Sequence, residues 1–209
     1  LRKPRGISIV EVLIVAVLLF SLLSLVTNFL VKGKRMTVKT EALSSLQREA
    51  TKLSRALGRD LARACGDRYQ WGTEGIIFLS TKSTDSAQPT LEFDSATGMV
   101  LWKKWVAYSL DSETQTVRRY TQDLAGPTPD QFAPPSAWDL ADLAGLPVNE
   151  GKTVANNILE FVPTGKADSQ SMEFRIVAVG RVPLGNMAEK DKELRVEIKT
   201  MLRLGSVAP

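Results

Sequence analysis

The chain has 209 residues, which is enough for one membrane helix and one globular domain of ordinary size. Its 27 basic and 23 acidic residues give a formal net charge of +4, but Arg2, Lys3 and Arg5 supply three of the basic groups. The remainder is nearly neutral, so charge favours no nucleic acid or other charged partner. Histidine is absent, which removes the commonest general base and metal ligand, and the single cysteine, Cys65, precludes an internal disulfide.

The first element is an apolar run from Ile7 to Val31, in which Glu11 is the only charged residue. A helix of this length spans roughly 37 Å, which exceeds a hydrocarbon core of about 30 Å. The run is too long for an ordinary secretory signal and lacks its small-residue cleavage site. Since a carboxylate costs about 2.5–3.5 kcal/mol at the bilayer centre, Glu11 either lies at the interface of a simple signal anchor or has a functional partner.

The residues around Gly6 follow a specific order: a short basic leader, Gly6, an aliphatic residue, a hydroxyl residue, two aliphatic residues and Glu11. This order resembles the class III signal of type IV prepilins and type II secretion pseudopilins. The resemblance implies that a prepilin peptidase removes residues 1–6 and methylates Ile7, which stands where most members have phenylalanine. It also implies that Glu11 pairs with the N-terminal amine of a neighbouring subunit. Within one subunit this pairing is awkward, because a side chain four residues along need not point at the helix start.

Helical patterning continues beyond the membrane edge. Apolar residues recur there at spacings of three and four, at Leu43, Leu46, Ala50, Leu53, Leu57, Leu61 and Ala64. Because no proline interrupts residues 5–88, this pattern predicts one helix from about Ser8 to Ala64. Residues 7–31 would form its transmembrane or filament-core half, and residues 32–66 its amphipathic distal half.

The opposite face of the distal helix is basic. Its positive residues, also at spacings of three and four, are Arg48, Lys52, Arg55, Arg59 and Arg63. The simplest interpretation is a solvated face, partly balanced by acidic residues of the same helix. The main alternative is packing against acidic neighbours in a filament, and DNA binding is less favoured.

After Gly66 the pattern changes to that of strands. Apolar residues alternate or cluster over 76–79, 91–93, 99–110, 117–120, 158–162, 172–182 and 194–204. One apolar face of such a sheet needs a cover, and the distal helix is available to provide it. The predicted fold class is therefore α+β, of type IV pilin-like form, with a long N-terminal helix packed on an antiparallel sheet of a β-rich domain at residues 67–209.

Residues 121–153 interrupt the strand pattern and contain five of the ten prolines. A loop of this length is usually functional or disordered, and Phe132 and Trp138 argue against plain disorder. These two aromatic side chains either fold back onto the core of the domain or form a partner-binding surface.

No phosphate-binding loop, metal-ligand cluster or nucleophile elbow occurs in the sequence, so we expect no enzyme activity, cofactor or metal. The segments Leu46-Gln47-Arg48 and Gly58–Ala64 are similar to the distal helix of PilW-type minor pilins and of the secretion pseudopilin J. This resemblance implies a subunit that helps to prime and cap a type IV pilus, or alternatively lies at the tip of a type II secretion pseudopilus.

The implied partners are other minor pilins, the major pilin or pseudopilins, prepilin peptidase, the inner-membrane assembly platform and, before assembly, membrane lipid. The implied location is the bacterial inner membrane, with the N-terminus cytoplasmic and the globular domain periplasmic. Charge alone leaves this orientation open, since basic residues flank both ends of the apolar run. A membrane-anchored binding or sensor domain would not be cut at Gly6, and an anchored enzyme would need a catalytic set.

Overall fold

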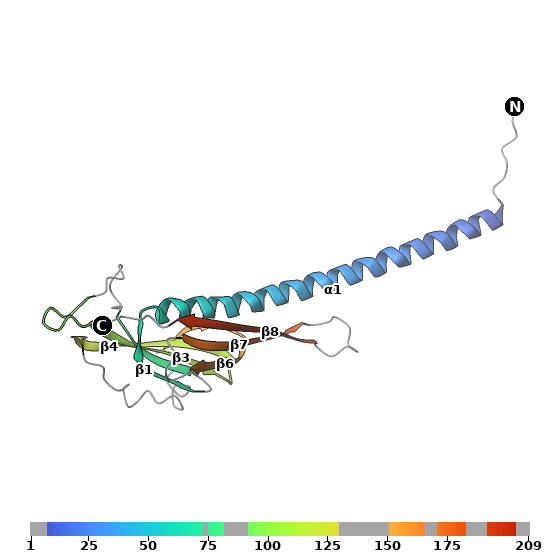
Figure 1. Cartoon of the computed structure of the whole chain (residues 1–209). Coiled ribbons are helices and arrows are strands. Elements are labelled where there is room, and N and C mark those ends of the chain that lie inside the picture. Colours follow the sequence, from blue (N-terminus) through green and yellow to red (C-terminus); the bar gives the residue numbers. More distant parts are fainter. Residues whose placement is uncertain are drawn as a thin grey trace.

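A computed structural model of the chain describes residues 8–72, 75–81, 92–129, 151–165, 171–182 and 192–203. Within these residues one long helix precedes eight strands, in an α+β arrangement (Figure 1). The elements are α1 (Ile9–Leu61), β1 (Ala64–Gly72), β2 (Gly75–Ser80), β3 (Trp102–Asp111), β4 (Thr116–Thr128), β5 (Lys152–Ala155), β6 (Ile158–Gly165), β7 (Ser171–Val182) and β8 (Lys192–Arg203).

The helix α1 has 53 residues and is roughly 80 Å long. Figure 1 shows its first half projecting beyond the sheets and its second half lying along them. It ends at Leu61, before the predicted end at Ala64, because the chain turns where the N–H of Arg63 donates to the carbonyl of Asp60 at 3.1 Å. Ala64 is buried at 1% exposure, but it belongs to β1, so the predicted distal helix over residues 32–66 is too long.

The strands form two antiparallel sheets, not the single sheet that the sequence predicted. One has the order β1-β2-β3-β4-β5 and the other the order β6-β7-β8. The chain passes from the first sheet to the second at Asn157, whose backbone is left-handed with a φ of 59°. Asparagine tolerates this conformation better than most residues. The carbonyl of Asn157 accepts from the N–H of Val179 at 2.8 Å, which ties the crossover to β7.

Strands also occur where the sequence predicted none. The expected interruption at residues 121–153 starts too early, because β4 continues to Thr128 and β5 resumes at Lys152. Pro127 is tolerated within β4 because β5 pairs only with the first residues of that strand, which leaves this part of the strand at an edge. The predicted strand at 91–93 is reduced to an isolated bridge between Phe93 and Val100.

The main core lies between the distal half of α1 and both sheets. The predicted helix stripe is buried: Leu53, Leu57 and Leu61 are all 0% exposed. They pack with Phe78 of the larger sheet and Phe174 of the smaller sheet, among other apolar residues. The helix-on-sheet prediction is confirmed, and burial of this size is the main stabilising contribution to such a fold.

The other face of the larger sheet holds a second apolar cluster, which includes Ile77, Leu79, Trp105 and Tyr120. The six residues of β2 are accordingly all buried. A strand covered on both faces carries a continuous apolar run, which explains why its sequence does not alternate.

Candidate functional site

The first half of α1 has no protein cover in the described structure. Its large apolar residues from Ile9 to Val31 are between 43% and 81% exposed. Within the described residues, α1 is the one helix long and apolar enough to cross a membrane. An exposed apolar surface of this size is typical of a site that contacts other protein or a membrane.

The start of α1 is closed by Ser8 and Glu11. The Ser8 hydroxyl accepts from the backbone N–H of Val10 at 3.3 Å, and the Glu11 carboxylate accepts from the backbone N–H of Ser8 at 3.2 Å. The two contacts form a capping box, which satisfies backbone donors that a helix start leaves free. The carboxylate therefore turns back toward the start of its own helix, a direction that the sequence analysis left open.

The other residues singled out by sequence lie outside the described part of the chain. Gly6 and Ile7 precede Ser8, the first described residue, and Phe132 and Trp138 fall within residues 130–150. Glu11 is therefore the one predicted site residue whose surroundings the structure gives. The proposed cut after Gly6 and the proposed partner surface stay predictions.

The distal half of α1 presents its basic face to solvent. Arg48, Lys52, Arg55 and Arg59 are exposed, and Arg63 is partly exposed. Lys52 lies 3.8 Å from Glu49, whose carboxylate also accepts from the backbone N–H of Asn156 at 2.9 Å. The basic side chains are therefore at least partly exposed to solvent, while Glu49 on the same helix attaches it to the crossover between the sheets.

A polar cluster that the sequence did not reveal attaches α1 to the larger sheet. Asp60 on α1 accepts at one carboxylate oxygen, Oδ2, from the Tyr108 hydroxyl at 2.7 Å and from Arg119 Nε at 2.6 Å. Tyr108 lies on β3 and Arg119 on β4, so the cluster joins three elements. Burial lowers the pKa of Arg119, but the hydrogen bond and the charge of Asp60 outweigh this effect and raise it above its usual value.

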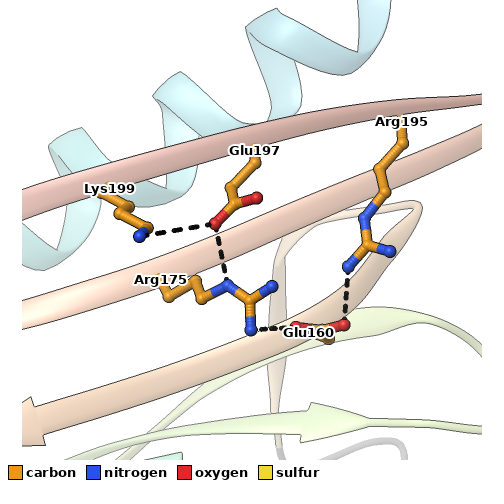
Figure 2. A network of polar contacts seen from close by, with 5 residues as sticks. All are labelled: Glu160, Arg175, Arg195, Glu197 and Lys199. Atoms are coloured by element: carbon orange, nitrogen blue, oxygen red, sulfur yellow. Dashed lines mark hydrogen bonds and ion pairs between the residues drawn. The ribbon is translucent and has the colours of Figure 1, made fainter.

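Charges on the outer face of the smaller sheet are arranged differently (Figure 2). Arg175 lies between Glu160, at 3.0 Å, and Glu197, at 2.9 Å, while Arg195 also contacts Glu160 at 2.8 Å. A hydrogen bond from Arg175 is the main cause that lowers the pKa of Glu197. Each charged group here, Lys199 included, has a partner of opposite sign, so this face is a self-paired charge ladder. Exposed pairs of this kind add little stability each.

No protein family, curated protein or solved structure matches the chain in the three comparisons with known proteins.

Proposed function

We propose that this chain is a minor pilin, which joins other minor pilins to prime and cap a type IV pilus. The observation that carries the proposal is the position of Glu11, a carboxylate in the first turn of an apolar helix without protein cover. The alternative is a minor pseudopilin at the tip of a type II secretion pseudopilus, which would use the same helix in the same way.

The apolar half of α1 supports a role in a helical assembly as well as in a membrane. Before assembly, lipid would cover the residues from Ile9 to Val31. In a filament, the helices of neighbouring subunits would replace the lipid. No part of the described chain covers this apolar surface, and either environment removes it from water.

The length of α1 separates this half from the globular domain. The first buried residue of the helix is Leu46. It follows Val31 by a stretch of helix about 22 Å long at the usual rise per residue. With the N-terminus in the cytoplasm, the domain would stand in the periplasm, clear of the membrane surface. In the periplasm the domain would contact other subunits. The inner-membrane assembly platform would hold the helix.

The energetics of Glu11 favour a charge partner. After removal of residues 1–6 by prepilin peptidase, Ile7 would carry a positive amine at the membrane level. At about 4 Å and an effective dielectric constant of about 20, an ion pair with a neighbour's amine gains about 4 kcal/mol before desolvation. This exceeds the cost of about 2.5–3.5 kcal/mol for a carboxylate at the bilayer centre. In the free subunit the capping box would hold the carboxylate until a neighbour arrives.

The test compares Glu11→Ala with Glu11→Gln, by recovery of tagged partner subunits from membranes. Glutamine still accepts from the Ser8 N–H and so keeps a capping box, but it has no charge. We expect both variants to insert, to be cut after Gly6 and to recover at least about tenfold less partner, a change that corresponds to 1.4 kcal/mol.

Ser8→Ala is the matched control, because it removes the capping hydroxyl and keeps the carboxylate. It should recover partners like the parent chain. Wild-type recovery with Glu11→Gln but not with Glu11→Ala would mean that Glu11 only caps the helix. Normal recovery with both variants would show that Glu11 has no part in assembly.

A further inference from the structure

Two adjoining hollows lie along the distal half of α1. The larger, with a cavity volume of about 1190 Å³, follows the outer face of the helix, and the smaller, of about 530 Å³, lies between the helix and strands β4 and β5. Lys52 and Arg59 line both hollows, which therefore adjoin, and we treat the two together as one groove. We name it the basic groove after its positive lining residues, which are Arg48, Lys52, Arg55, Arg59 and Arg63 of α1, Arg119 of β4 and Lys152 of β5.

The carboxylates in the basic groove are already engaged. Glu49 accepts from the backbone of Asn156, and Asp60 is shared by Tyr108 and Arg119. Within the described part of the chain, the lining arginines of α1 and Lys152 form no ion pair. In the self-paired ladder of the smaller sheet, by contrast, each charged group has a partner of opposite sign. The groove holds an excess of positive charge that the described residues do not neutralise.

The spacing of this charge fits a helical partner. The lining cations of α1 recur every three or four residues, which corresponds to about 5.4 Å, one helical turn. Carboxylates on one face of a second helix recur at the same distance. Five of the seven positive lining residues are arginines, four of them on α1, and planar guanidinium groups can bind carboxylates with two hydrogen bonds each.

The surroundings disfavour the other anionic partners. Arg48 follows Val31 by about 25 Å of helix, so headgroups of a membrane spanned by the apolar half lie too far away. Single-stranded nucleic acid binds through exposed aromatic rings, whereas Tyr108, the one aromatic residue among the described residues that line the groove, is 0% exposed.

We propose that the basic groove is a docking surface for an acidic helical segment of another protein. The carboxylates of that segment would face Arg55 and Arg59 at the middle of the groove, and Lys152 would contact it from the sheet side. Because the proposal rests on the distal half of α1, it does not depend on processing after Gly6 or on the role of Glu11.

The test uses the full chain in an uncharged detergent and measures fluorescence anisotropy of a labelled peptide. The peptide is an alanine-based helix of about 20 residues with glutamate on one face. We expect the parent chain to bind it, and Arg55→Glu/Arg59→Glu to bind at least about tenfold more weakly, with an affinity that falls as salt is raised. The variant Arg55→Gln/Arg59→Gln, which only removes the two charges, should bind the peptide with an affinity between those of the parent chain and the charge-reversed variant.

The matched control is Arg181→Glu/Arg203→Glu, which makes the same change in net charge at exposed positions outside the groove. Its affinity should stay within about twofold of the parent. A peptide with lysine in place of glutamate should not bind the parent chain, because the groove carries an excess of positive charge. Glu11→Ala should bind the acidic peptide normally, which separates this proposal from the proposed function.

Three outcomes would overturn the proposal. The parent chain fails to bind the acidic peptide, or both reversed pairs weaken binding equally, so that only net charge matters. Alternatively, a labelled oligothymidylate of equal charge binds the parent more tightly than the peptide and is lost on reversal of Arg55 and Arg59. That result would assign the groove to nucleic acid.

Discussion

The hydroxyl of Tyr108 donates to the Asp60 carboxylate at 2.7 Å, across 48 residues of sequence, and so ties β3 to the last turn of α1. Burial, followed by the negative charge of Asp60, raises the pKa of Tyr108. The phenol therefore stays protonated and continues to donate throughout the physiological pH range. Together with Arg119, this contact fixes which face of α1 turns toward the sheets and which face is left as the basic groove.

Substitution of this pair should reveal coupling between helix and sheet. Tyr108→Phe removes one hydrogen bond and should lower the free energy of unfolding by about 1 kcal/mol. Asp60→Ala should cost more, about 1–3 kcal/mol, because it leaves the Tyr108 hydroxyl and the Arg119 guanidinium without their shared acceptor. Urea denaturation of the single and double variants measures both effects. Strictly additive losses would contradict the coupling.

Leu53→Asp should be among the most damaging changes in the distal helix. Leu53 is 0% exposed in the main core, so the variant buries an unpaired charge and should lose more than about 4 kcal/mol. Gln47→Asp introduces the same side chain at an exposed position of the same helix and should melt within a few degrees of the parent. Equal melting temperatures for the two variants would refute the helix-on-sheet packing.

A chain that begins at Thr37 should be soluble and folded. The residues removed include none of the buried residues of α1, the first of which is Leu46. The exposed apolar half is lost with them, which removes the need for detergent. We expect the thermal transition of the full chain to be retained, as monitored by circular dichroism. Aggregation or loss of the transition would show that the first half of α1 is required for folding.

Asp94 should titrate below its ordinary pKa of 3.8, mainly because the Thr97 hydroxyl donates to its carboxylate and secondly because the Ala96 N–H does. A lowered pKa means that the ionised Asp94 stabilises the turn at residues 95–97 at pH values above its pKa in the unfolded chain, and that this stabilisation is lost as the pH falls through its pKa in the folded chain. Thr97→Val removes the largest cause and should raise the pKa toward 3.8. Carboxyl NMR titration measures this change, and an unchanged pKa would contradict it.

The parts of the fold that the sequence predicted correctly have strong periodicity. The stripe of Leu53, Leu57 and Leu61 repeats every four residues, and β8 alternates apolar and charged side chains. Two strands escaped prediction for physical reasons. β1 contains Gly66, Gly72 and Asp67, which rarely favour strands, and β5 is too short to establish a period.

Long-range relationships were not accessible from sequence. The split into two sheets depends on the left-handed backbone at Asn157, which no local pattern marks. The basic stripe of α1 was visible, but the contribution of Lys152 depends on how β5 lies beside the helix. At the helix start, the sequence identified Glu11 but not the direction of its carboxylate, although Ser8 three residues before Glu11 is the sequence signature of a capping box and could have indicated it.

The most direct test of the proposed pilin role is mass spectrometry of the N-terminal peptide of the protein purified from its native membranes. We expect a chain that begins at Ile7 with one added methyl group, and a Gly6→Leu variant that keeps residues 1–6. Native protein that retains residues 1–6 uncut would contradict the account.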